Sequence, residues 1–178
     1  MLAEVCEARC RENCEKKGLE IRLMRGSAVE KLNRVLSLAN VFEREEPRLA
    51  AMMTRVAGVR RDVNLRERIR GGMVEKLAPV LTHILEDGAE DDLFTLSRPE
   101  ETAKLILLLS HDAVEEVMRI LSESPDDPEA LVRAMDVLDA ARDGIERMIA
   151  APYGSVRIAE LDRLIASLRE AEAALAKG

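Results

Sequence analysis

Three cysteines, Cys6, Cys10 and Cys14, recur every four residues near the N-terminus. If this stretch is helical, that spacing places all three thiols on one face of the helix. A disulfide within the set is unfavourable, because β-carbons four residues apart on a helix lie about 5–6 Å apart, whereas a disulfide requires about 3.8 Å. Two thiolates could instead bind a soft metal, with a histidine completing the ligand set. Because cysteine also packs as a small apolar residue, we favour packing over a metal or thiol sensor.

The two histidines, His83 and His111, are the other side chains suited to proton transfer or metal binding. His111 falls on an apolar helical face, where a histidine more often makes core or interface hydrogen bonds than it catalyses a reaction. A run of carboxylates lies between Glu86 and Asp92. Acid/base catalysis requires environments that give two such groups different pKa values, and the sequence indicates no such difference here. The sequence has no Ser-His-Asp pattern, glycine-rich phosphate loop or His-Glu metal motif. It therefore predicts neither an enzyme nor a bound cofactor.

The composition predicts a globular acidic domain, because 47% of the 178 residues are hydrophobic, 34% are charged and the formal net charge is -7. A negative charge and only 2% aromatic residues argue against direct nucleic-acid binding by this segment. The longest apolar stretch, Leu105–Leu109, is far shorter than the roughly 20 residues that span a bilayer. With no signal peptide and an odd number of cysteines, we expect a cytoplasmic location and no membrane partner.

Helix start and stop signals divide the chain into about seven predicted helices. Capping residues mark three of the starts: Ser27 with Glu30, Asn64 with Glu67, and Asp127. The predicted helices cover residues 1–17, 27–45, 48–57, 64–88, 98–122, 128–151 and 156–177. No segment combines strand alternation with turn residues. The sequence therefore predicts an all-α fold, an antiparallel helical bundle that forms a single domain over residues 1–178.

Residues 98–151 form a predicted helical hairpin that is apolar on more than one face. Such a helix must be covered from more than one side. We therefore predict a second copy of the chain that completes a four-helix interface about a two-fold axis. The alternative is that the C-terminal helix, residues 156–177, covers the hairpin within one chain. The predicted interface residues recur at helical spacing and are Leu107, Val114, Val117, Leu121, Leu131, Ala134, Leu138, Ala141, Ile145 and Met148.

The order of these segments resembles the C-terminal domain of the tetracycline-repressor (TetR) family. The similar stretches are AVEKLNRVLSLANVFEREEPRLAAMM, LRERIRGGMVEKLAPVLTHILEDGAEDDLFTL, RPEETAKLILLLSHDAVEEVM and GIERMIAAPYGSV. The family's N-terminal helix-turn-helix module is absent from this chain, so residues 1–17 would correspond to the connecting helix that follows it. The sequence departs from the family at Asp91-Asp92-Leu93, where the family often has a glycine before the aromatic residue at Phe94.

The resemblance implies the effector-binding and dimerisation domain of a bacterial transcriptional regulator, a homodimer that contacts DNA only through a module not present in this chain. Effector binding would change the spacing of the two DNA-reading modules. The implied effector is small and apolar or amphipathic, with Asn40 and His83 as polar contacts. Its pocket would be lined by Leu38, Asn40, Phe42, Met52, Met53, Leu81, His83, Ile84, Leu105 and Leu108.

The alternative function is a stand-alone helical interaction or scaffold module that binds protein and does not bind DNA. The sequence encoded upstream of Met1 distinguishes the two, because a helix-turn-helix there would support the regulator.

Overall fold

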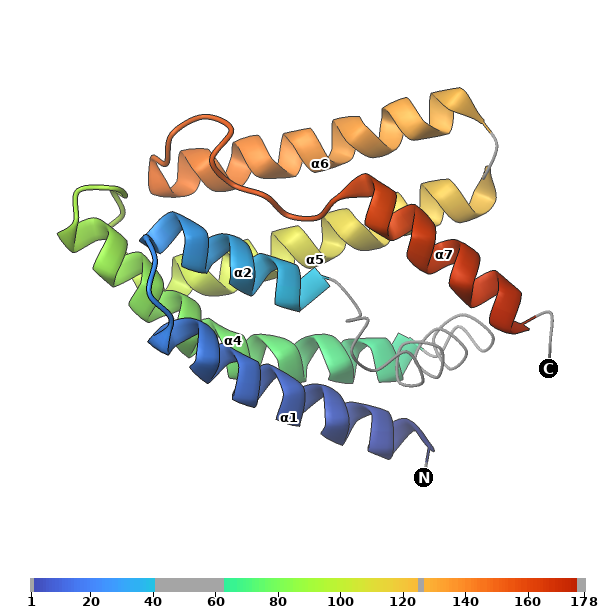
Figure 1. Cartoon of the computed structure of the whole chain (residues 1–178), viewed down its shortest axis with the longest axis horizontal. Coiled ribbons are helices and arrows are strands. Elements are labelled where there is room, and N and C mark those ends of the chain that lie inside the picture. Colours follow the sequence, from blue (N-terminus) through green and yellow to red (C-terminus); the bar gives the residue numbers. More distant parts are fainter. Residues whose placement is uncertain (1, 41–62, 125–126, 176–178) are drawn as a thin grey trace.

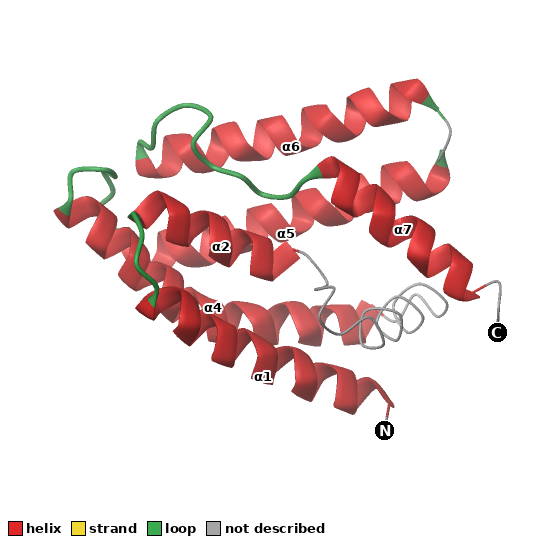
Figure 2. Cartoon of the chain, in the orientation of Figure 1, coloured by secondary structure: helices red, strands yellow, loops and turns green. Residues whose placement is uncertain are grey.

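The computed structural model describes residues 2–40, 63–124 and 127–175, and every regular element in these ranges is an α-helix (Figures 1 and 2). The all-α class is therefore confirmed for this part of the chain. The predicted helix over residues 48–57 lies outside the described residues. The helices are α1 (Leu2–Leu23), α2 (Ala28–Asn40), α4 (Val63–Glu90), α5 (Pro99–Glu123), α6 (Pro128–Ile149) and α7 (Leu161–Leu175).

Helix α4 lies at the centre of the packing, with α1, α2 and α5 all in contact with it. Helices α5 and α6 pair as the antiparallel hairpin that the sequence predicts, and α7 crosses α5 (Figure 1). The largest fully buried side chains are aliphatic and come from four of the helices, which gives one continuous core. They are Leu32, Val35, Leu36, Leu77, Leu81, Ile84, Leu85, Ile106, Leu107, Ile145 and Ile149.

Two of the predicted helix caps are present. At the start of α2, the Glu30 carboxylate accepts from the Ser27 backbone N–H at 2.8 Å, and the Ser27 hydroxyl accepts from the Glu30 N–H at 3.2 Å. At the start of α6, the Asp127 carboxylate accepts from the Glu129 N–H at 2.9 Å. Each such cap contributes about 1 kcal/mol. Helix α4 already begins at Val63, so Asn64 lies inside its first turn and the cap predicted there is wrong.

Helix α1 continues through Gly18 to Leu23, so the end predicted at Lys17 is wrong. Gly18 is buried against α4, and a β-carbon there would lie 3.2 Å from Val80 Cγ2 and 3.3 Å from Leu77 Cδ2. The missing side chain lets the two helices approach closely. This packing offsets the roughly 1 kcal/mol by which glycine disfavours a helix interior.

Helix α7 begins at Leu161, five residues later than the predicted start at Val156. Residues 155–160 instead form an extended segment, the strap, in which alternate residues Val156 and Ile158 are buried. Side chains supply the hydrogen bonds that a helix would have made. The Val156 N–H donates to Glu146 Oε1 at 3.0 Å, and the Arg157 N–H donates to Asn33 Oδ1 at 2.8 Å. Asn33 also donates through Nδ2 to the Ser155 carbonyl at 2.9 Å.

The TetR resemblance predicts a glycine before Phe94, which this chain lacks. In the turn after α4, another residue adopts the backbone conformation expected of that glycine. Asp92 itself adopts the left-handed conformation, with φ at 57°. The backbone N–H groups of Leu93 and Phe94 both donate to the Gly88 carbonyl, at 2.8 and 3.0 Å. The turn brings the buried Phe94 ring directly over Gly88, which closes that end of α4.

Candidate functional site

Most of the helical seam predicted to face a second copy is already buried within the single chain. This group comprises Leu107, Val114, Val117, Leu121, Ala134, Ala141 and Ile145. Periodicity correctly indicated that these residues pack, but they pack within the chain's own core, where α5 lies between α4 and α6. Leu138 is half-buried, and only Leu131 and Met148 remain exposed. An interface with a second copy would therefore have to combine these exposed positions with other residues of the hairpin.

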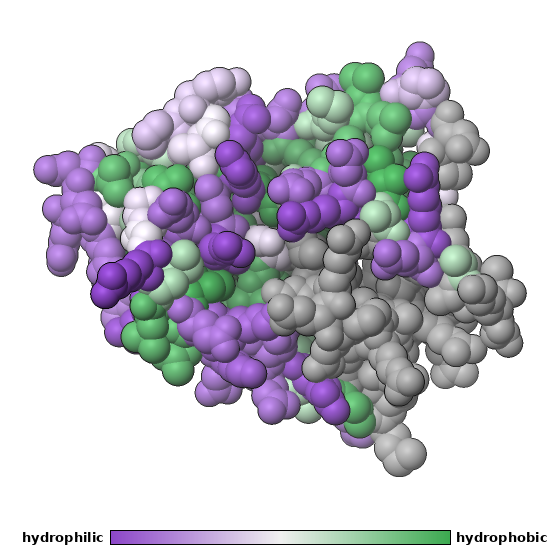
Figure 3. Space-filling view, viewed as in Figure 1, coloured by the Kyte–Doolittle hydropathy of each residue, from purple (hydrophilic) through white to green (hydrophobic). Residues whose placement is uncertain are grey.

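The exposed apolar side chains of the hairpin gather on the first half of α6. Leu131, Val132 and Met135 are 37, 57 and 53% exposed, and we call these three residues the α6 patch. Met135 lies four residues after Leu131 and three after Val132, so the three side chains are neighbours on the helix surface. Figure 3 shows apolar residues on the part of this face of the molecule where the first half of α6 lies. Leu105 on α5 and Met148 in the last turn of α6 are also exposed but lie apart from the patch along the chain.

Helix α7 covers the hairpin only in part. It packs against α5 and buries Leu164, while the strap buries Val156 and Ile158. The alternative that the C-terminal helix covers the hairpin within one chain is therefore partly correct. It leaves the α6 patch uncovered, and this patch is the largest group of neighbouring exposed apolar side chains on the described hairpin.

Of the residues predicted to line an effector pocket, those that the structure describes are dispersed. Leu81 and Ile84 are core residues of α4, whereas Leu38 and Leu108 are half-buried. His83 and Leu105 are exposed and so face away from the core, with His83 Nδ1 3.3 Å from Glu86 Oε2. Asn40 is the last residue of α2. Phe42, Met52, Met53 and the Asn40 side chain lie outside the described residues.

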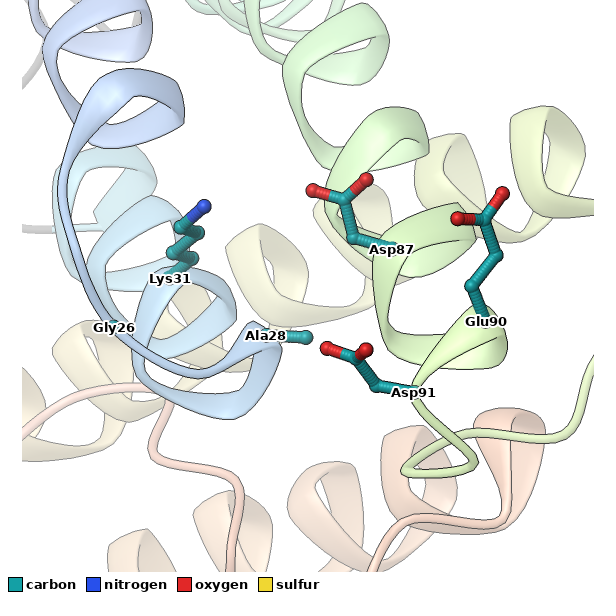
Figure 4. Close-up of a pocket in the computed structure, with 6 residues that line it drawn as sticks. All are labelled: Gly26, Ala28, Lys31, Asp87, Glu90 and Asp91. Carbon is teal, nitrogen blue, oxygen red and sulfur yellow. The ribbon is translucent and has the colours of Figure 1, made fainter.

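A shallow open depression lies between the start of α2 and the end of α4, with a volume of about 170 Å³. Small-molecule sites usually enclose about 300–1,000 Å³ and are mostly apolar. This depression is lined by Gly26, Ala28, Lys31, Asp87, Glu90 and Asp91. Figure 4 shows Asp87 and Asp91 turned toward α2 and Glu90 turned away. The carboxylate run of the sequence thus forms a solvated surface, and none of the predicted pocket residues lines this depression.

Helix α1 carries two of the three predicted thiols on the face that packs against the core. Cys14 is buried, and Cys10 is half-buried against the same core. A hydrogen bond between the two thiols lowers the pKa of Cys10 and raises the pKa of Cys14, and burial adds to the rise at Cys14. The side chain of Cys6 lies outside the described residues. Within the described residues, no three His, Cys, Asp or Glu side chains come together as metal ligands.

His111 on α5 is largely buried, as its apolar helical face suggests, and it lies 3.7 Å from Glu115. Desolvation lowers the pKa of His111 below 6.5, and this outweighs the opposing effect of the Glu115 and Asp112 carboxylates. Arg70, which reaches Asp112 from α4 at 2.9 Å, also favours the neutral imidazole. The folded protein therefore holds a neutral histidine at a pH where the unfolded chain would begin to protonate it.

This shift gives the free energy of unfolding a pH dependence that His111→Gln should remove. The unfolded chain binds more protons than the folded chain at pH values below about 6.5, so the wild type loses stability as the pH falls through this range. We expect denaturant titrations between about pH 8 and pH 5.5 to show a smaller loss for His111→Gln than for the wild type. Parallel curves for the two proteins would contradict the assignment.

Glu146 is a buried carboxylate that the sequence analysis did not single out. It lies on α6 and is only 4% exposed, with one carboxylate oxygen bonded to the strap at Val156. Within the described residues, its other oxygen and the buried Ser155 hydroxyl have no hydrogen-bond partner. The sequence signal is weak, because a glutamate beside Ile145 resembles any surface glutamate of an amphipathic helix. Through these hydrogen bonds, Glu146 on α6 and Asn33 on α2 hold the strap in place. They thereby also position the start of α7.

None of the described helices is long and apolar enough to cross a membrane. No protein-family model matches this chain, and no match was found among curated proteins or solved structures.

Proposed function

We propose that this chain is a self-associating helical module, and that it serves as the dimerisation and effector-binding domain of a TetR-like bacterial transcriptional regulator. The observation that supports self-association is the α6 patch, in which Leu131, Val132 and Met135 are exposed and neighbouring. A contiguous group of exposed apolar side chains is a surface on which a partner can bury apolar area.

We propose that a second copy of the chain binds to the α6 patch. The buried apolar residues of helix α6 are Ala130, Ala134, Ala141, Ile145 and Ile149, and the helix packs mainly against α5, so it lies at the edge of the bundle. An edge helix can pair with its own symmetry mate, because a two-fold axis brings the same patch of both copies together. The paired hairpins would then form four helices, each α6 packing against α5 of its own chain and against the other copy.

The regulator assignment adds a role for helix α1, which would connect the sensing domain to a DNA-reading module. Helix α1 packs along α4, and α4 packs against α5 of the hairpin. Ion pairs join α1 to α4 along this contact: Arg11 pairs with Glu75, and Lys76 lies 3.2 Å from Glu15. A change in the position of α4 would therefore move α1. An effector that favours one of two positions would shift the population between them.

The stand-alone interaction module shares the dimer, but it binds a protein instead of a small-molecule effector and has no DNA-reading partner domain. Reading the coding sequence on the N-terminal side of α1 separates the two. A basic helix-turn-helix there supports the regulator, whereas an unrelated domain or a stop codon supports the interaction module.

Oxidation of methionines by peroxide provides the test of the α6 patch as a self-association surface. Met135 is 53% exposed in the single chain, so it should react readily at low protein concentration. At concentrations where the dimer forms, we expect its oxidation rate to fall by about tenfold, since a dimer occupied about 90% of the time leaves Met135 open for the remaining tenth. Peptide mass spectrometry measures the rate at each methionine separately.

Met24 serves as the internal control for this measurement, because it is half-buried at the end of α1, away from the hairpin. Its oxidation rate should not change with protein concentration. Protection of Met24 and Met135 to the same extent would indicate general aggregation. An unchanged rate at Met135 would show that the patch faces solvent at every concentration, against the proposal.

A further inference from the structure

Cys10 and Cys14 form a pair of adjacent thiols on one face of α1. They lie one turn apart, and Gly18 follows one turn later on the same face, where it contacts Leu77 and Val80 of α4. Cys14 is buried in the core, whereas Cys10 is half-buried and so reachable from solvent. Both cysteines are free thiols, and the interaction between the two thiols lowers the pKa of Cys10.

A disulfide does not fit this pair, but a bridge one atom longer does. β-Carbons one helical turn apart are separated by about 5–6 Å, which exceeds the roughly 3.8 Å of a disulfide. Inserting a single atom between the two sulfurs lengthens the bridge and removes the need to unwind the helix. That atom must be thiophilic and must be satisfied by two sulfur ligands, because the described residues bring no third ligand to the pair.

Trivalent arsenic that already carries one carbon substituent meets both requirements. Its pyramidal geometry leaves two positions for sulfur and places those two sulfurs next to each other. Zinc, by contrast, needs four ligands in a structural site. Cys6 cannot complete a three-sulfur site with both of the others, because it lies eight residues, or about 12 Å of helix, from Cys14.

We propose that Cys10 and Cys14 are a bidentate dithiol site for monosubstituted trivalent arsenicals. In the reaction, two S–H and two As–OH bonds break, two As–S bonds form and two water molecules leave. The arsenic stays trivalent, so no oxidant or reductant takes part. Attack starts at Cys10, the more accessible thiol and the one whose pKa is lowered, and closes at Cys14. This site is independent of the proposed dimer, since it lies on α1 and not on the hairpin.

The test titrates the reduced, folded chain with phenylarsine oxide and follows adducts by native mass spectrometry and free thiols by a colorimetric thiol assay. We expect one adduct per chain and the loss of two thiols per adduct. A small dithiol should remove the adduct, whereas a monothiol at the same concentration should not. Cys10→Ser leaves Cys14 without its neighbour and should weaken binding by about a hundredfold, the advantage of two linked contacts over one.

Two further variants decide which cysteine pair is used. Cys6→Ser leaves only the Cys10 and Cys14 pair and should bind like the wild type, whereas Cys6→Ser combined with Cys14→Ala leaves the single thiol of Cys10 and should bind weakly. If the double variant fails to fold, as circular dichroism would reveal, Cys6→Ser alone gives the answer. Loss of the two-thiol adduct in Cys6→Ser, full affinity in Cys10→Ser, or no adduct on the folded wild type would each overturn the assignment.

Discussion

Replacing Gly88 with alanine is expected to lower the free energy of unfolding by about 3 kcal/mol, the upper part of the range for inserting atoms into a packed core. A β-carbon at Gly88 would lie 2.2 Å from Phe94 Cδ2 and 2.9 Å from the Ala28 β-carbon. Phe94 is buried, and its own backbone N–H is bonded to the Gly88 carbonyl, so the ring has little room to move away. Chemical denaturation measures the change, and the midpoint should fall without a change in slope.

Gly71 provides the matched control, because it lies in the same helix and a β-carbon there would meet nothing within 4 Å. Gly71→Ala should raise the free energy of unfolding by about 0.5–1 kcal/mol through its better helix propensity. The two substitutions make the same chemical change in α4 and are expected to act in opposite directions. Equal changes in the free energy of unfolding from Gly88→Ala and Gly71→Ala would show that the close contact between Gly88 and Phe94 does not determine the effect at Gly88.

Replacing Met135 with lysine is expected to weaken self-association by about thirtyfold or more. Burying an ammonium group without a partner costs about 2–5 kcal/mol, and each 1.4 kcal/mol corresponds to a factor of ten in the dissociation constant. The single chain should tolerate the change, because Met135 is exposed and lysine is a good helix former. Sedimentation velocity over a range of concentrations measures the dissociation constant.

Leu23→Lys is the control for this experiment, because Leu23 is even more exposed than Met135 but lies at the end of α1. It makes a similar exchange of an apolar side chain for a charge, away from the hairpin. We expect its dissociation constant to match that of the wild type. If both variants dissociate to the same degree, net charge rather than the α6 patch would control association.

Local signals in the sequence predicted much of the fold. The residues that cap α2 and α6 make the expected hydrogen bonds, because capping depends only on neighbours within one turn. The hairpin of α5 and α6 was predicted for a similar reason, because the prolines and the aspartate between the two helices are local signals that end one helix and start the next. Gly18 misled the prediction because its effect depends on α4, which lies some 60 residues away along the chain.

The candidate site was harder to predict, because periodicity shows that a face is buried but not what buries it. Leu107 and Ile145 recur at helical spacing, and both pack inside the chain's own bundle. The exposed residues Val132 and Met135 fall outside that seam, so no repeat marked them. The strap is a related case. Its conformation depends on hydrogen bonds from Asn33, 124 residues before Arg157, and such a distant pairing leaves no local pattern.

Equilibrium sedimentation of the reduced wild-type chain tests the central claim, that the α6 patch of one chain packs against another copy. We predict that the mass rises with concentration from 19.8 kDa to twice that value and then stays constant, as a closed two-fold dimer requires. A mass that stays at 19.8 kDa at every concentration would contradict the dimer and, with it, the proposal of a dimeric regulator domain.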